Sequence, residues 1–243
     1  MEEAEYRKMA DVEDGMWYYR ALHGHILDRL MNAAGQVEGP LLDAGCGTGG
    51  LLRRLHEKHP ELELTGVDLS PLACELARER TTAHIVEASL TDLPLDDATF
   101  ATVVSADVLY HIEDDATALR ELYRVLKSGG RLVVNVPAYP WLWSYHDKAV
   151  HAQRRYGRRE LTCKLRDAGF LVTELTHWNM LLLPLVVARR KLWPAPASGS
   201  DVRAYARWSN RLLNLVMRCE RWVLRTCGAL PAGSSLLAIA RKP

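Results

Sequence analysis

A glycine-rich loop at residues 41–49, LLDAGCGTG, carries the residue types best suited to chemistry. Two leucines lead into Asp43, and Gly45, Gly47 and Gly49 follow at alternate positions before the helix-like run LLRRLHEKH. Glycine suits such a turn because it adopts positive φ angles and has no Cβ to obstruct a ligand that approaches the backbone. The loop therefore predicts a cofactor cradle between a buried strand and a helix.

The glycine spacing by itself leaves the kind of cofactor open. Gly45, Gly47 and Gly50 also satisfy the dinucleotide pattern G-x-G-x-x-G, and Asp68 follows at about the twenty-residue distance of a ribose-binding acid. An NAD-dependent oxidoreductase is therefore one interpretation of this segment. It gives no reason for the motifs that follow between residues 90 and 112.

The wider sequence resembles the class I S-adenosylmethionine-dependent methyltransferases, whose first motif is an acid followed by G-x-G-x-G. GVDLS at 66–70 resembles that family's second strand, which ends in the acid that holds the ribose hydroxyls. LTDLPLDDATFATVVSADVLYHI at 90–112 resembles its L-P-x-x-x-x-F run, its fourth strand and the motif after that strand. The resemblance implies S-adenosylmethionine as the cofactor. It implies cofactor contacts from Tyr18, Arg20, Asp43, Ala44, Gly45, Cys46, Gly47, Asp68, Leu69, Ser89, Leu90 and Ala106.

Two of these assignments depend on particular features of the family. Many members carry Gly-Asp-Ala before the Leu-Pro element, where the acid accepts from the adenine amino group, whereas this chain has Ala88, Ser89 and Leu90. A serine hydroxyl and the Leu90 amide could still bracket the adenine edge. Tyr18 and Arg20 belong to GMWYYRALHGHILDRL, which resembles the helix that often closes over the cofactor before the first strand. Packing is the alternative role for that helix.

Methyl transfer by in-line displacement needs little covalent help from a protein, because aligning the acceptor with an activated methyl group supplies much of the acceleration. A base is needed only if the acceptor loses a proton. His111, after the fourth expected strand, and His151, after the fifth, are candidates because histidine titrates near neutral pH. Each could instead be structural. The loop after the fifth strand adds Tyr156 as a third catalytic candidate, and an aromatic acceptor chamber is expected from Tyr139, Trp141, Trp143, Tyr145, His146, His151 and Tyr156.

The elements that must position these residues alternate between strands and helices. This pattern predicts an α/β, Rossmann-like fold with a seven-stranded, mostly parallel sheet and helices on both faces. Strands are expected near 40–44, 62–67, 83–87, 101–105, 130–136, 170–176 and 235–240, with helices between the first five. Ser70-Pro71 and Asp114-Asp115 mark helix starts. The resemblance implies that the last strand is antiparallel.

One domain over 1–243 is expected from the length and from a hydrophobic content of 48%. Its parts are an N-terminal helical lid at 1–36, a cofactor-binding core at 37–177, a helical cap insertion at 178–230 and a final strand at 231–243. The cap is expected to contain a turn-rich linker at 193–200 and a helix over 201–225. On that helix a Trp- and Leu-rich face, expected to lie against the apolar body of the acceptor, borders an edge of arginines expected to lie near its negative group.

Charge is distributed unevenly along the chain. The net charge is only +1, yet residues 151–228 carry 15 Lys and Arg against 5 Asp and Glu. This balance favours a small acceptor that is anionic or lipid-like, with peripheral membrane contact through the 201–225 helix as a further possibility. A solvated arginine face is the plainer interpretation, and the chain could be a monomer or a homodimer.

Other classes of function receive less support. A nucleic-acid methyltransferase would suit the basic segment, but ADVLYH stands where base-amino methyltransferases typically carry N/D-P-P-Y/F, so no nucleic acid is expected as partner. A non-enzymatic binding module is disfavoured by the intact glycines and acids. Five scattered cysteines without a C-x-x-C pair, and the lack of a signal peptide, predict a reducing cytoplasm and no metal site.

Overall fold

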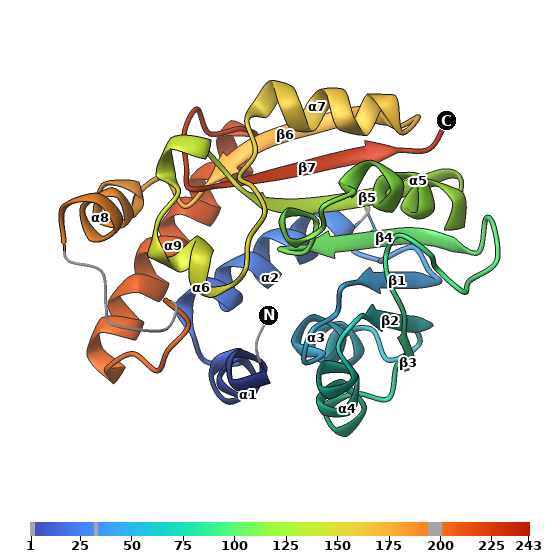
Figure 1. Ribbon diagram of the computed structural model, residues 1–243, viewed down its shortest axis with the longest axis horizontal. Helices are drawn as coiled ribbons and strands as arrows, with labels where there is room; N and C mark the ends of the chain where they lie inside the picture. The colour runs from blue at the N-terminus through green and yellow to red at the C-terminus, as the bar shows by residue number, and fades with distance from the viewer. Residues whose placement is uncertain (1–2, 32–33, 194–200) are drawn as a thin grey trace.

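A seven-stranded sheet forms the centre of the computed structural model, which describes residues 3–31, 34–193 and 201–243 (Figure 1). The spatial order is β3-β2-β1-β4-β5-β7-β6, and β7 runs antiparallel to both of its neighbours while the other pairs are parallel. Each strand overlaps its expected range, so the predicted fold class is confirmed. The strands are β1 (Leu41–Ala44), β2 (Leu64–Asp68), β3 (His84–Glu87), β4 (Phe100–Ala106), β5 (Leu126–Pro137), β6 (Leu171–Trp178) and β7 (Ser235–Arg241).

Helices precede, connect and follow the strands. The α-helices are α1 (Glu3–Val12), α2 (Trp17–Leu30), α3 (Gly50–Lys58), α4 (Pro71–Arg80), α5 (Asp115–Val125), α6 (Tyr145–Ala149), α7 (Arg158–Asp167), α8 (Leu183–Val187) and α9 (Arg207–Cys227). Short 3-10 turns η1 (Leu109–His111) and η2 (Pro140–Leu142) and a π-helical turn η3 (Ala188–Leu192) complete the set. No helix in the described part of the chain is long and apolar enough to cross a membrane.

The expected helix between the third and fourth strands is absent from residues 88–99, all of which the structure describes. Pro94 lacks the backbone donor that a helix interior needs, and the buried Leu90 and Leu93 anchor this run to the core instead. The Arg124 guanidinium donates to the carbonyl oxygens of Leu93 and Leu95. The connection from β3 to β4 is therefore a loop that is held in place by its buried leucines and by Arg124.

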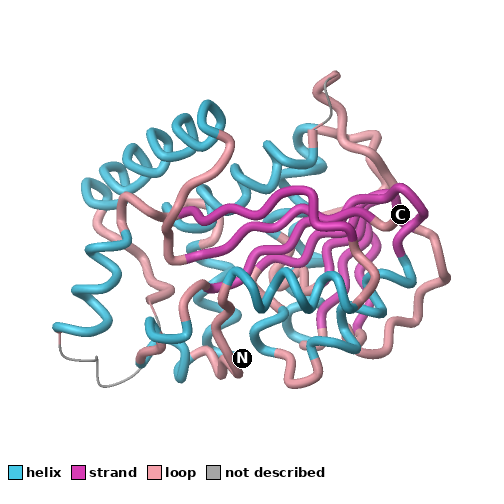
Figure 2. The backbone as a smooth tube through the Cα atoms, turned by 90° about the horizontal axis from the view of Figure 1, so that it is seen from above, coloured by secondary structure: helices cyan, strands magenta, loops and turns pink. Residues whose placement is uncertain are grey.

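Alternating side chains of the strands belong to two hydrophobic clusters, one on each face of the sheet. Leu41 belongs to the cluster that contains residues of α2, α3, α4 and α9, and its neighbour Leu42 to the cluster formed with α5 and α7. Figure 2 shows the strands between these helical layers. Burial on both faces holds the strands in place. It thereby fixes the positions of their carboxyl ends and of the residues that follow.

Helix starts occur where the sequence predicts them. The Ser70 hydroxyl accepts from the Ala73 amide at 3.3 Å, and the Asp114 carboxylate accepts from the Thr117 amide at 3.0 Å. Such side-chain caps satisfy N–H groups that have no partner within the helix. They begin α4 and α5 immediately after Ser70 and Asp114, which keeps the strand-end residues before them in the loops.

The helix of the segment between β6 and β7 begins later and buries a different face than expected. α9 starts at Arg207, and the expected 193–200 linker lies almost wholly outside the described residues. Met217, Glu220 and Leu224 are its buried side chains, whereas the Trp- and Leu-rich face is exposed, with Trp208 at 72%. The contact predicted between this face and the acceptor is therefore not what the structure shows, because the face is turned to solvent.

Long-range ion pairs explain this orientation of α9. Arg221 and Arg225 both donate to the Asp28 carboxylate on α2, and the buried Glu220 carboxylate accepts from the amides of Asn179 and Leu181, just after β6. These partners lie far away in the sequence. They turn part of the arginine edge towards α2 and leave the aromatic face in solvent.

Candidate functional site

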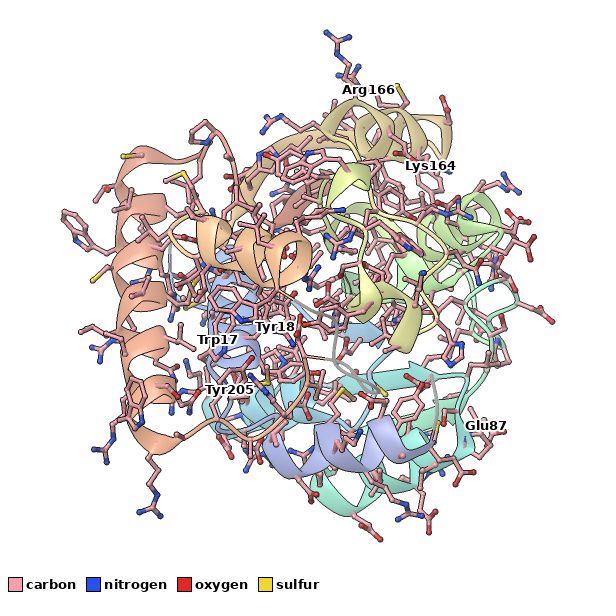
Figure 3. The ribbon with its side chains drawn as sticks, turned by 60° about the vertical axis from the view of Figure 1, so that its left-hand side comes forward. Trp17, Tyr18, Glu87, Lys164, Arg166 and Tyr205 are labelled. Carbon is pink, nitrogen blue, oxygen red and sulfur yellow. The ribbon has the colours of Figure 1, made fainter. Side chains whose placement is uncertain are left out.

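A cavity of about 650 Å³ lies beyond the carboxyl ends of the central strands. Its lining comes from α1 and α2, the glycine loop, the residues after β2, β3 and β4, the loop after β5, and the segment between β6 and β7. Trp17, Tyr18 and Tyr205, all lining residues, lie close together in Figure 3 although Tyr205 is distant in sequence. One cavity thus connects the predicted cofactor cradle with the most basic part of the chain.

The glycine loop adopts the predicted strand–turn–helix geometry. Gly45 has φ 89° and Gly47 φ 53°, both in the region that side chains other than glycine rarely adopt. A Cβ on Gly45 would lie 2.2 Å from the Val108 Cγ2 atom, and one on Gly47 would lie 2.8 Å from the Met9 Cε atom. At Gly45, close packing by Val108 and the backbone conformation both demand glycine. At Gly47 the backbone conformation is the stronger constraint, because the end of the Met9 side chain can move.

The amides of this loop already have partners within the protein. Gly45 and Cys46 donate their N–H groups to the Val67 carbonyl at 2.7 and 2.9 Å, and Gly49 donates to the Cys46 carbonyl at 2.9 Å. The Gly47 amide donates to the Asp68 carboxylate at 2.9 Å. A pyrophosphate needs several free N–H groups converging on it. The loop therefore fits a dinucleotide poorly.

Three buried carboxyl groups face the same part of the cavity. Asp43, Asp68 and Glu13 are 2%, 8% and 5% exposed. Burial, followed by the charges of Glu13 and Asp68, raises the pKa of Asp43 to about 8. Burial also raises the pKa of Asp68 and of Glu13, although hydrogen bonds counteract it in both. Carboxylates that destabilise one another in this way are stabilised by a cationic ligand.

Asp107 contributes a further acid immediately after β4. Its carboxylate accepts from the Tyr18 hydroxyl at 2.8 Å and from the Asn135 amide at 2.7 Å. Trp178 donates to the Asn135 side-chain oxygen at 2.7 Å, which fixes the orientation of that amide. Burial raises the pKa of Asp107 to about 6, against the lowering effect of the two hydrogen bonds. Asp107 is thus a carboxyl group that titrates near neutral pH in the cavity wall.

The lining from the loop after β5 and from the β6–β7 segment is rich in arginine. Arg155 donates to the Asp147 carboxylate at 2.6 Å, and Arg190 donates to the Asp201 carboxylate at 3.3 Å. The Nε and Nη1 atoms of Arg190 are buried and have no hydrogen-bond partner among the described residues. Arg189 and Arg203 also line this part. These arginines outnumber the two aspartates, so this end suits an anionic group.

The cavity brings together most of the residues predicted as cofactor or catalytic groups. They are Tyr18, Asp43, Gly45, Cys46, Gly47, Asp68, Leu69, Ser89, Leu90, Ala106, His111 and His151.

Three predicted residues lie elsewhere. Arg20 is on the exposed side of α2, and the Ala44 side chain is buried in the core. Tyr156 is 1% exposed, and its hydroxyl donates to the Asp115 carboxylate at 2.7 Å. Since Asp115 begins α5, Tyr156 joins the loop after β5 to that helix and takes a structural position instead of the predicted catalytic one.

The predicted aromatic chamber is also largely structural. His146 and His151 line the cavity, but the tyrosines and tryptophans proposed for the chamber do not. Tyr139 stacks on His177 with ring centroids 5.3 Å apart, and Trp141 is exposed. The aromatic lining comes mainly from elsewhere: Tyr6, Trp17, Tyr18, Tyr19, Tyr110 and Tyr205.

Sequence reasoning missed a group of lining residues on and after α1. Tyr6, Met9 and Glu13 line the cavity, and the Tyr6 hydroxyl lies 3.4 Å from the Asp68 carboxylate. Their spacing of three and four residues is typical of one helical face and could have identified them. Asp107 could also have been identified from the sequence, because this acid directly follows the apolar run of the fourth expected strand.

Comparison with known proteins agrees with this geometry. A family described as "Methyltransferase domain" matches residues 42–134. The chain is 36% identical over 98 residues to "Ubiquinone/menaquinone biosynthesis C-methyltransferase UbiE" of Desulfotalea psychrophila, covering 39% of this chain and 40% of that protein. It is 32% identical over 163 residues to "O-methyltransferase rstn1" of Aspergillus nomiae, covering 61% of this chain and 70% of that protein.

A solved structure shows the same fold. The complex of the Haloferax volcanii Trm112 methyltransferase activator with a putative methyltransferase matches with a TM-score of 0.65 and 23% identity, over 99% of this chain and 94% of that one. The chain spans about half the length of the first curated relatives it matches, from 40% to 54%. The sequence matches and the acid-lined glycine loop together show that the chain belongs to the class I S-adenosylmethionine-dependent methyltransferase family.

Proposed function

We propose that the protein transfers a methyl group from S-adenosylmethionine to a small amphiphilic acceptor. The observation that carries this proposal is the cavity itself, which joins three buried acids at the glycine loop to an apolar and arginine-bearing end. Glu13 is paired with Arg80, whereas Asp43 and Asp68 form no ion pair with any described residue and suit a cationic cofactor. The other end suits an apolar body with a negative group. The relatives named above as quinone C-methyltransferase and O-methyltransferase support small-molecule methylation.

The chain's own residues divide the work of holding the cofactor. Asp68 would accept from the ribose hydroxyls, with Leu69 beside it, and Ser89 and Leu90 would border the adenine. Asp43 would face the cationic part at the glycine loop. When bound, the cofactor supplies a methyl group activated on a sulfonium. The protein then has to align an acceptor with that methyl group and exclude water.

The segment between β6 and β7 is assigned the predicted role of a cap over the acceptor. Leu182, Leu185 and Val186 give the cavity apolar lining from this segment. Arg190 offers two buried N–H groups without a hydrogen bond, although its Nη1 atom also lies 3.9 Å from the Asp147 carboxylate. A carboxylate or phosphate near Arg190 would satisfy them. The acceptor class proposed here is therefore an apolar molecule with one anionic group.

Asp107 is a better candidate than His111 for a general base. Burial lowers the pKa of His111 to about 4, so its imidazole binds a proton weakly at neutral pH. The pKa of Asp107, raised to about 6, lies closer to the working range, where proton transfer is most effective. A base role for His151 remains a prediction, as does the cytoplasmic location.

Replacement of Asp107 by asparagine is expected to lower kcat by about 100-fold if the acceptor must lose a proton. The activity of the wild-type enzyme should rise with pH around 6, as Asp107 loses its proton, and the variant should lack that rise. Cofactor affinity, measured by calorimetry, should change little.

Tyr18→Phe is the matched test of this assignment. The Tyr18 hydrogen bond lowers the pKa of Asp107, so its loss should move the rise in activity to higher pH. A purely structural role for Asp107 would leave the position of that rise unchanged.

The class of reaction can be tested before the acceptor is known. Purified protein, S-adenosylmethionine and fractionated extracts are combined, and formation of S-adenosylhomocysteine is followed. Turnover is expected with lipid-soluble acidic fractions. Turnover with RNA alone would favour the nucleic-acid alternative, and cofactor binding without turnover in any fraction would favour a binding module.

A further inference from the structure

The outward face of α9 is an apolar stripe. Trp208, Leu212, Leu215 and Trp222 are 72%, 53%, 56% and 67% exposed, and Cys219 between them is also exposed. At the helical repeat of 100° per residue these five side chains fall within a sector of about 80°. α9 follows one margin of the molecule in Figure 3, and its outer side chains project away from the body. We call these five residues the α9 stripe.

A second set of exposed apolar side chains lies on α8 and at the end of η3, near α9. Leu185 on α8 is 56% exposed, and Leu192 and Trp193 at the end of η3 are 78% and 66% exposed. α8 and α9 lie next to each other in both Figure 1 and Figure 3. Leu185 also lines the cavity. Exposed apolar side chains of the segment between β6 and β7 therefore lie at the mouth of the proposed acceptor site as well as on α9.

The charge beside the α9 stripe is positive. Arg207, Arg211 and Arg218 are exposed on one flank of α9 and form no ion pair with any described residue. Glu220 is the acid of this helix, and it is 0% exposed. Negative charge is therefore missing from the exposed surface of α9, and the arginines have no intrinsic counterion there.

We propose that the α9 stripe and its arginine flank dock on an anionic lipid surface. Monomeric proteins seldom expose a continuous apolar area of this kind without a partner. Tryptophan and leucine on one face of a helix, with arginine beside them, suit the boundary between acyl chains and headgroups. The arginines complement negative headgroups. In a symmetric antiparallel pair of α9 helices they would instead meet arginines of the second copy, which disfavours a dimer of that kind through this face.

Docking through α9 would bring the cavity mouth near the lipid surface, because the exposed Leu185 on the neighbouring α8 also lines the cavity. An amphiphilic acceptor would then have only a short distance to cover between the bilayer and the cavity. This consequence rests on the proposed function, whereas docking itself does not. Vesicle binding and cofactor binding are separate measurements, so either proposal can fail alone.

Flotation with vesicles tests the docking surface. The full chain is expected to float with vesicles of phosphatidylcholine and phosphatidylglycerol in equal parts, much less with phosphatidylcholine alone, and less at high salt. The variant R207E/R211E/R218E should lose affinity for the mixed vesicles by on the order of 100-fold. W208S/W222S should also lose binding, because both aromatic anchors are removed.

The matched control reverses the charge of three exposed arginines on α7, in the variant R158E/R159E/R166E. Arg166 lies on a different part of the molecule from α9 in Figure 3, so this variant should bind vesicles as the wild type does. Calorimetry with S-adenosylmethionine confirms that each variant is folded. Equal loss in the α7 and α9 charge variants would overturn the proposal, since total charge would then explain binding.

Two further results would also overturn it. One is a wild-type chain that does not float but sediments as a dimer that W208S/W222S dissociates, because a second copy then covers the stripe. The other is RNA binding, without vesicle binding, that the α9 variants abolish. Vesicle binding that depends on both Trp208 and Arg211 supports the proposal that the α9 stripe docks on an anionic lipid surface.

Discussion

Asp68→Ala is expected to weaken binding of S-adenosylmethionine roughly 100-fold, measured by titration calorimetry. Two charge-assisted hydrogen bonds from ribose hydroxyls would be lost, at about 1.5 kcal/mol each. The same carboxylate accepts from the amides of Gly47 and Ser70, both at 2.9 Å. The substitution should therefore also loosen the glycine loop and lower the melting temperature.

Two further variants separate these effects. Asp68→Asn keeps a side-chain oxygen for one loop amide, so it should recover part of the stability and little of the affinity. Glu87→Ala removes an exposed carboxylate from the end of the next strand, β3, and should bind the cofactor normally. Normal affinity in Asp68→Ala would show that the ribose is held elsewhere.

The second large effect concerns pH and Asp43. Because burial and the neighbouring acids raise the pKa of Asp43 to about 8, this carboxyl group is mostly protonated at neutral pH without a ligand. A cationic cofactor favours the ionised form, so binding should release a proton. Affinity should then rise with pH by up to about tenfold per unit between roughly pH 6 and 7.5, below the titration of the cofactor's own amino group.

Asp43→Asn provides the control, since its side chain cannot release a proton. Binding by this variant should be nearly independent of pH over the same range, and its binding enthalpy should not depend on the ionisation enthalpy of the buffer. The free energy of unfolding of the wild type without cofactor should fall with pH, whereas its cofactor affinity rises. A raised folded-state pKa means that stability falls as pH rises from about 4 towards 8, and this fall should be smaller in Asp43→Asn. A pH-independent wild type would contradict the assignment.

Much of the cofactor end was predictable because its determinants are local. Asp43, Gly45 and Asp68 lie at strand ends, and the apolar runs that define those strands are short and contiguous. Alternation of strands and helices then places the strand ends together. The helix expected between β3 and β4 was a wrong prediction that the sequence could have prevented, because Pro94 interrupts any helical pattern there.

The acceptor end was less predictable because its determinants are far apart in sequence. α9 has two apolar faces, one containing Met217 and Leu224 and the other Trp208 and Trp222. The choice between them depends on Asp28, almost two hundred residues earlier, and on the amides after β6. The buried position of Tyr156 was missed for a similar reason, since its partner Asp115 lies about forty residues earlier, at the start of α5.

The position of α1 has a consequence for the speed of ligand exchange. Tyr6 on this helix places its hydroxyl 3.4 Å from the Asp68 carboxylate. Just beyond the carboxyl end of the helix, Glu13 accepts from Thr48 at 2.6 Å and from Arg80 at 2.8 Å. α1 therefore lies across the ribose acid and is tied to the glycine loop and α4 behind it. Release of the spent nucleoside past Asp68, and with it turnover, would then depend on how often α1 moves aside.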